Sequence, residues 1–67
     1  MLIIAQNLKT LRNEQNLTQE QVADVIGVKR NVYGRYENDT RTIPIELLIK
    51  LADFYNVSLD YLVGREI

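Results

Sequence analysis

The side chains best suited to bind a charged or polar partner gather in the stretch GVKRNVYGRYEN, residues 27–38. Arg30 and Asn31 are adjacent, and both end in planar groups that can form two hydrogen bonds with one partner. Residues 27–43 hold four basic residues against two acidic ones, whereas the rest of the 67-residue chain holds four against seven, and the net charge is −1. Two interpretations are open here: an ordinary solvated face, or a surface that binds an anion.

The residues that most enzymes and metal sites depend on are missing from this sequence. It contains no histidine and no cysteine, which removes the usual ligands of zinc and copper and every nucleophile–base pair built on those side chains. No close pair of carboxylates suggests general acid–base catalysis in a cleft. We therefore predict that the protein is not an enzyme and needs no cofactor and no metal.

Length and hydropathy indicate the class of protein. Sixty-seven residues predict one domain, residues 1–67. No apolar run approaches the roughly 18 residues of a membrane helix, and the opening MLIIAQ is too short for the core of a signal peptide. We therefore expect a soluble, cytoplasmic domain with no membrane partner.

Apolar residues recur at helical spacing along nearly the whole chain, and we expect five helices. The first covers about residues 3–15. The second opens after Thr18, because Gln21 follows at the spacing of a capping box, and it ends before Gly27, a residue suited to positive φ. The third ends around residues 37–38, where Asn38 can adopt the left-handed conformation.

The last two helices are marked by their own end signals. Pro44 fits the first turn of a fourth helix that Asn56 ends, and Ser58 caps a short fifth helix that Gly64 follows. The pattern predicts a compact, all-α, five-helix bundle. Its buried side is expected to be formed by Ile4, Leu8, Leu11, Val22, Ala23, Ile26, Val28, Tyr33, Tyr36, Leu47 or Leu48, Leu51, Ala52, Tyr55, Leu59 and Leu62.

The second and third helices are expected to form one unit. Only about three residues, 27–29, join them, so the two helices must cross at a sharp angle. Ala23 has the small side chain that a close crossing needs. The layout predicts a helix-turn-helix at about residues 18–38.

The stretch LTQEQVADVIGVKRNVYGRYEN, residues 17–38, resembles the DNA-binding helix-turn-helix of the phage repressor and Cro-like proteins, the XRE family. The likeness continues through LIKLA, residues 48–52, and NVSLDYL, residues 56–62. The resemblance implies a lambda-repressor-like fold and double-stranded DNA as the partner. The sequence departs from the family's usual residues at three positions: Lys29, Tyr33 and Asp39.

The resemblance also implies that the third helix lies in the major groove and reads bases mainly through its N-terminal residues. Arginine can bond guanine and asparagine can bond adenine, and a valine on the exposed side of the helix would suit a thymine methyl group. A glycine there would let the backbone approach DNA or leave room for the arginines. The candidates for base reading are Arg30, Asn31, Val32, Gly34 and Arg35.

Other residues are expected to hold the DNA backbone, which sets affinity and register but carries no sequence information directly. By resemblance, Gln19 and Asn38 contact phosphates. The start of the second helix, at Thr18, adds free N–H groups and a positive dipole end. Three weaker candidates complete the set: Lys29, Thr40 and Arg41.

Two structural assignments follow from the same resemblance. Arg12 of the first helix should pair with Glu37 at the end of the third and hold the recognition helix on the bundle. A dimer interface would involve the connection between the last two helices and the fifth helix. Its candidates are Asn56, Val57, Tyr61, Val63 and Ile67.

The sequence leaves two functions open. The first is a sequence-specific DNA-binding transcription regulator, a repressor that binds a palindromic operator as a homodimer. The second is a helix-turn-helix that has kept the fold but binds a protein, in the manner of an antitoxin or anti-repressor. The acidic balance of the chain favours the protein partner slightly, whereas Arg30, Asn31 and Arg35 on one face favour DNA.

Overall fold

The computed structural model describes residues 2–65. Within that range the chain forms five helices: α1 (Leu2–Glu14), α2 (Gln19–Ile26), α3 (Arg30–Glu37), α4 (Ile45–Tyr55) and α5 (Leu59–Val63). The all-α, five-helix prediction is confirmed, with α1 displaced by one residue from the expected 3–15. The candidate interface residue Ile67 lies outside the described residues.

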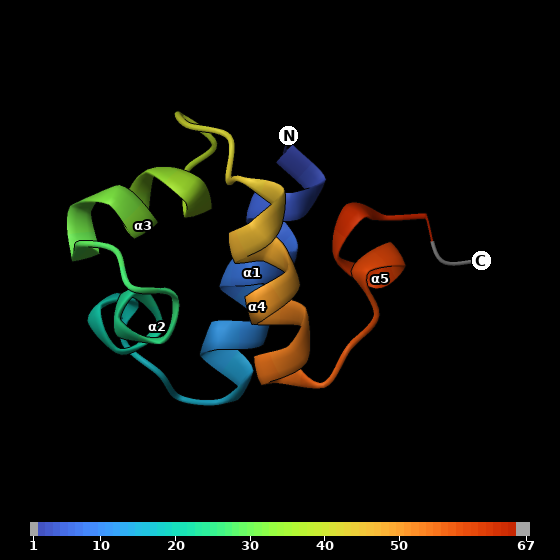
Figure 1. The fold of residues 1–67 in the computed structure, drawn as a ribbon, viewed down its shortest axis with the longest axis horizontal. Coiled ribbons are helices and arrows are strands. Elements are labelled where there is room, and N and C mark those ends of the chain that lie inside the picture. The colour runs from blue at the N-terminus through green and yellow to red at the C-terminus, as the bar shows by residue number, and fades with distance from the viewer. Residues whose placement is uncertain (1, 66–67) are drawn as a thin grey trace.

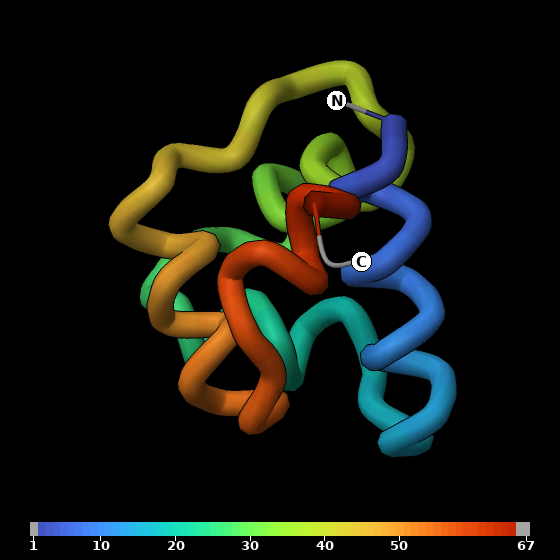
Figure 2. The backbone as a smooth tube through the Cα atoms, turned by 90° about the vertical axis from the view of Figure 1, so that its right-hand side faces the viewer, coloured from blue at the N-terminus to red at the C-terminus, as the bar shows by residue number. Residues whose placement is uncertain are grey.

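The helices are arranged around one shared interior. In Figure 1, α4 lies in front of α1, with α2 and α3 to one side and α5 to the other. The perpendicular view shows that α1 and α4 stand at opposite edges of the bundle (Figure 2). The space between them is filled because α3 and α5 pack on α1, while α2 and α5 pack on α4. Helices α2 and α3 are therefore attached to the bundle from both edges.

The core is made by the helical stripes that the sequence indicates. Its buried members are Ile4, Leu8, Leu11, Val22, Ala23, Ile26, Tyr33, Tyr36, Ile43, Leu48, Leu51, Ala52, Tyr55 and Leu62. Leu48, not Leu47, is the fully inward residue of the pair, and Leu47 packs from the rim together with Val28 and Leu59. Ile43 joins from the loop before α4, which the helical pattern did not predict because Ile43 belongs to no helix.

The helix ends follow the predicted chemistry at five places, one of which is Gly64, which ends α5 at φ +78°. Thr18 and Gln21 form a complete capping box, in which the Thr18 hydroxyl accepts from the Gln21 N–H and the Gln21 side-chain Oε1 accepts from the Thr18 N–H. Ser58 caps α5 by accepting from the Tyr61 N–H. Gly27 ends α2 at φ +73°, and Asn56 ends α4 at φ +56°. These local hydrogen bonds and turns fix where α2, α4 and α5 begin or end.

Two end predictions are wrong by one residue. Asn38 has φ −94°, and the left-handed residue is Asp39 at φ +63°. The cause is a local turn in which the Asn38 side-chain oxygen accepts from the Thr40 N–H at 3.1 Å. Pro44 lies before the first turn of α4, as its N-cap, with an extended backbone at ψ 146°.

Two glycines of the helix-turn-helix should respond to alanine in opposite directions. At Gly27, alanine would have to hold φ +73°, which costs roughly 1–2 kcal/mol in an L-residue even though its Cβ would meet nothing within 4 Å. At Gly34, the new Cβ would lie 3.4 Å from the end of the flexible Gln19 side chain, an ordinary contact, while helix propensity improves by about 1 kcal/mol. Chemical denaturation should show Gly27→Ala less stable and Gly34→Ala more stable than the parent chain. Equal and same-sign shifts would contradict this explanation.

Candidate nucleic-acid interface

The turn between α2 and α3 is closed by backbone hydrogen bonds. The Gly27 N–H donates to the Asp24 carbonyl at 3.3 Å, and the Val28 N–H donates to the Ala23 carbonyl at 3.0 Å. Ala23 is buried at the crossing, as its small side chain predicts. The turn leads into α3, and Lys29 occupies the N-cap position of that helix. The Lys29 side chain forms no capping hydrogen bond. A lysine thus stands where serine or threonine is usual, and the start of α3 lacks the hydrogen bond that those residues supply.

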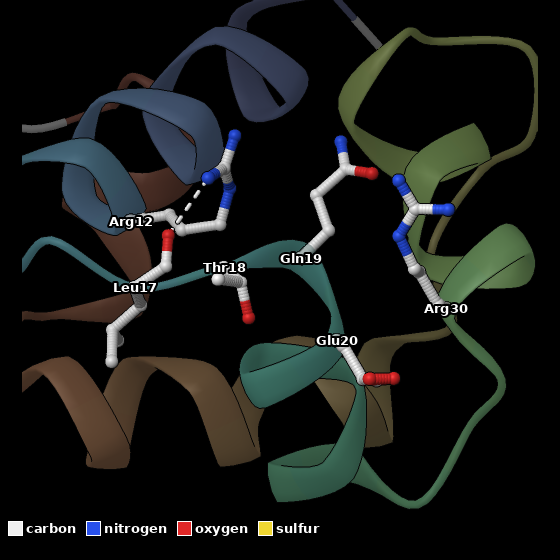
Figure 3. Close-up of a pocket in the computed structure, with 6 residues that line it drawn as sticks. All are labelled: Arg12, Leu17, Thr18, Gln19, Glu20 and Arg30. Carbon is white, nitrogen blue, oxygen red and sulfur yellow. Dashed lines mark hydrogen bonds between the residues drawn. The ribbon is translucent and has the colours of Figure 1, made fainter.

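The first turn of α3 presents its polar side chains to solvent. Arg30 and Asn31 are exposed, as are Lys29 before them and Arg35 one turn later. Arg30 also borders an open hollow of about 590 Å³ whose other lining residues are Arg12, Leu17, Thr18, Gln19 and Glu20. In Figure 3 the polar ends of Arg12, Gln19 and Arg30 point to the same side of this hollow. The structure therefore brings Arg30 beside the start of α2.

Two of the base-reading candidates do not lie as expected. Val32 was expected on the exposed side of the helix, but it is partly buried and packs against the core, so that expectation is wrong. Gly34 is directed toward α2, since a Cβ built on it would lie 3.4 Å from Gln19 Oε1. The space left by its missing side chain is thus taken up in part by Gln19, a neighbour that the sequence alone does not identify.

The phosphate candidates fall into three groups. Thr18 and Thr40 have hydroxyls engaged within the protein, the first as a cap of α2 and the second as a donor to Asn38 Oδ1 at 2.6 Å. Lys29 and Arg41 are exposed. Gln19 and Asn38, from opposite ends of the helix-turn-helix, line one small hollow together with Lys9.

Lys9 was missed by the sequence reasoning, although a signal for it exists. It lies three residues before Arg12 on α1, and residues at that spacing share a helix face. Once Arg12 is expected to reach Glu37, the same geometry directs Lys9 toward the end of α3. The structure places Lys9 beside Asn38 in the same hollow.

Arg12 and Glu37 form a two-pronged ion pair between α1 and α3. Arg12 Nε donates to Glu37 Oε2 at 2.6 Å, and Arg12 Nη2 donates to Oε1 at 3.1 Å. The exposed fractions of the two side chains are 13% and 3%. Arg12 Nη1 also donates to the Leu17 carbonyl at 2.8 Å, just before α2. Gln19 Nε2 completes the cluster by donating to Glu37 Oε1 at 3.2 Å. One guanidinium thus ties α1 to both helices of the unit.

The electrostatics of the cluster favour an ionised Glu37. Burial by itself would raise the pKa of this carboxyl, but the hydrogen bonds from Arg12 and Gln19 and the positive charge of Arg12 outweigh burial and lower the pKa. The Tyr33 hydroxyl also favours the carboxylate from its buried position, without the geometry of a hydrogen bond. Burial raises the pKa of Tyr33, and it raises the pKa of Tyr55 to about 12.

The dimer candidates are spread between surface and core. Tyr61 is 38% exposed and Asn56 is exposed at the end of α4, whereas Val57 and Val63 pack partly against the core. Other large apolar side chains are exposed on α1 and α4, namely Leu2, Ile3, Ile45, Ile49 and Phe54. Within residues 2–65 no helix is long and apolar enough to cross a membrane, and no group of three potential metal ligands occurs.

Comparison with known proteins agrees with this geometry. The profile of a family described as helix-turn-helix matches residues 8–62. The chain belongs to this family, the XRE-type helix-turn-helix proteins. A crystal structure of a transcriptional regulator from Listeria innocua has the same fold, with a TM-score of 0.89 and 33% identity over 96% of this chain and 60% of that one.

Curated relatives of the family differ in what their names state. The uncharacterized HTH-type transcriptional regulator YobD of Bacillus subtilis is 42% identical over 88% of this chain and 53% of its own length. Antitoxin PezA of Streptococcus pneumoniae is 38% identical, over 96% and 40%. The cryptic phage CTXphi transcriptional repressor RstR of Vibrio cholerae is 41% identical, over 92% and 56%. The chain thus spans about half the length of these curated relatives.

Removing either partner of the buried ion pair should destabilise the fold strongly. Arg12→Met or Glu37→Gln would leave a buried charge without its partner, at a cost of about 3 kcal/mol each. Because both changes remove the same interaction, Arg12→Met/Glu37→Gln should cost clearly less than the sum of the two. Denaturant unfolding of the four proteins measures this coupling. A coupling below about 0.5 kcal/mol would mean that the pair contributes no more than an exposed one.

The same pair predicts a dependence of stability on pH. Because the folded state lowers the pKa of Glu37 below its ordinary value of 4.5, the ionised group stabilises the fold fully above that pH. The contribution is lost as the pH falls through the lowered pKa. Unfolding measured between about pH 2 and 6 should show a smaller loss of stability in acid for Glu37→Gln than for the parent chain. Glu46→Gln, which removes an exposed carboxylate of α4, controls for the change in net charge. Parallel curves for Glu37→Gln and the parent chain would contradict the assignment.

Proposed function

We propose that this chain is the DNA-binding part of a transcription regulator and that α3 reads bases in the major groove of double-stranded DNA. The observation that carries the proposal is the exposed pair Arg30 and Asn31 in the first turn of α3. The turn before them holds α3 against α2, with Ala23 buried where the two helices cross. A recognition helix contacts bases mainly through its N-terminal residues. Arg30 would donate two hydrogen bonds to guanine, and Asn31 would form two with adenine.

The other base-reading candidates have different roles in this proposal. Arg35 is exposed one turn after Asn31 and is the next side chain within reach of the groove. Val32 keeps only its outer methyl surface for a thymine methyl group, since the rest packs on the core. Gly34 allows close approach without adding a contact of its own.

Backbone contacts would set the register of α3 in the groove. Gln19 and Asn38 come from opposite ends of the helix-turn-helix but line one hollow, so both would hold the DNA backbone on the same side of the recognition helix. The N–H groups at the start of α2 and the exposed Lys29 and Arg41 extend the positive surface. These contacts add affinity for any sequence and leave discrimination to Arg30 and Asn31.

Repression by a homodimer is the form of regulation we propose. One eight-residue recognition helix touches few base pairs, and two copies related by a two-fold axis double the number. Half-sites would then lie about one helical turn, roughly 34 Å, apart on a palindromic operator. The repressor RstR supports this reading through its name, whereas Antitoxin PezA supports the alternative of a helix-turn-helix whose main partner is a protein.

Selection from a random pool of duplex DNA at near-physiological salt tests the proposed function. We expect enrichment of a palindrome with G and A in each half-site. Arg30→Ala and Asn31→Ala should each weaken binding to that site by about 1–3 kcal/mol and relax the base preference at one position per half-site.

Two substitutions of exposed residues outside the helix-turn-helix, Lys50→Ala on α4 and Asn13→Ala on α1, serve as controls for loss of a cation and of an amide. Weak, salt-sensitive binding without enrichment would refute base reading by α3 and favour a protein partner. If the double variant Arg30→Ala/Asn31→Ala still enriches the same site, the protein binds DNA specifically, but Arg30 and Asn31 are not the residues that read the bases.

A further inference from the structure

A second hollow lies on the outer side of the ion pair, between α1 and the helix-turn-helix. It has a volume of about 230 Å³ and is lined by Lys9, Gln19, Gly34, Glu37 and Asn38. These residues come from three helices and from the residue that ends α3. Glu37 is the only acidic residue among them, and its charge is matched by Arg12. The remaining charge at the hollow is that of Lys9.

The orientation of the Asn38 amide is fixed by its own turn. Its oxygen accepts from the Thr40 backbone N–H at 3.1 Å and from the Thr40 hydroxyl at 2.6 Å. A backbone N–H can only donate, so the atom that faces it must be the oxygen of the amide. The NH₂ group of Asn38 is therefore turned away from Thr40 and remains available as a donor.

The orientation of the Gln19 amide is fixed in the same way from the other side. Gln19 Nε2 lies 3.2 Å from Glu37 Oε1, and a carboxylate oxygen that is paired with Arg12 can only accept. Nitrogen must therefore face Glu37. One of the two hydrogens on Nε2 serves that bond, and the second can donate to another acceptor at the hollow.

Gly34 keeps the hollow open. A Cβ at this position would already touch Gln19 Oε1 at 3.4 Å, and any longer side chain would enter the space between Gln19 and Asn38. The hollow thus offers an ammonium group and two amide NH₂ groups, with one oriented carboxylate that is already neutralised. Such a set of donors suits an oxygen-rich anion with several acceptors.

We propose that Lys9, Gln19 and Asn38 together bind a single phosphate of the DNA backbone, with Gly34 providing the space and Glu37 orienting Gln19. The proposal rests on the proposed function and adds to it the α1 residue Lys9 and the sharing of one phosphate by three helices. A DNA phosphodiester fits better than a free phosphate dianion, because a single cation faces a single charge.

The test compares Lys9→Ala with Lys50→Ala, which removes an exposed lysine from α4, on the duplex selected by the parent protein. Affinity is measured at several salt concentrations. Lys9→Ala should weaken binding to all sequences alike and reduce the slope of log K against log [salt] by about one for each bound copy of the chain. Lys50→Ala should leave affinity and slope unchanged.

A second arm locates the phosphate. A series of duplexes carries one neutral methylphosphonate at each backbone position in turn. At one position per half-site the neutral group should weaken DNA binding by the parent protein, while it should lower the affinity of Lys9→Ala only slightly further. Gly34→Gln, which favours helix and fills the hollow, should mimic this loss, while Gly34→Ala should retain most of the affinity.

The outcomes separate the two proposals. If the parent protein selects a DNA site but Lys9→Ala behaves like Lys50→Ala, the shared phosphate site is wrong and the proposed function stands. The same holds if no methylphosphonate position couples to Lys9, or if inorganic phosphate at millimolar concentration competes as well as DNA does. If the parent protein selects no DNA site, both proposals fall together.

Discussion

The arrangement of the helix-turn-helix depends on one interaction, the buried ion pair between Arg12 and Glu37. Helix α3 has only eight residues, lacks a side-chain N-cap and carries Gly34 in its interior. Helices of that length are marginal in water by themselves, so tertiary contacts must supply both its stability and its direction. The two-pronged contact with Glu37 fixes the end of α3 to α1, and the bond from Arg12 to the Leu17 carbonyl fixes the start of α2 to the same side chain.

An apolar contact could hold α3 on the bundle without giving it this orientation. Tyr33 and Tyr36 already do part of that work from the core, and their rings pack edge to face with centroids 6.4 Å apart. Burying the Glu37 carboxylate is unfavourable in itself, because burial opposes its charge. What the carboxylate adds is direction: it accepts from Arg12 on one side and from Gln19 on the other, so the amide of Gln19 is presented as a donor. The pair therefore links the stability of the fold to the chemistry of its surface.

Local signals in the sequence predicted most of the fold, and tertiary contacts decided the rest. The capping box at Thr18, the cap at Ser58 and the turn at Gly27 depend on nearby residues alone, and each lies where its spacing indicated. Asn38 did not follow its own preference because its side chain bonds Thr40 and the left-handed residue moves to Asp39. For Val32 and Gly34, helical position did not reveal which neighbour would cover them.

The acidic balance of the chain explains why oriented donors matter here. With a net charge of −1, these 67 residues give no long-range attraction to a polyanion, and at physiological salt such fields fade within about 8 Å. Under the proposed function, affinity for DNA must then come from groups that reach individual phosphates and bases. A flexible cation would lose side-chain entropy at each such contact, whereas Gln19 and Asn38 are already fixed by bonds within the protein. A weak helix carrying a few well-oriented polar groups can therefore serve an acidic chain better than a larger cluster of mobile lysines.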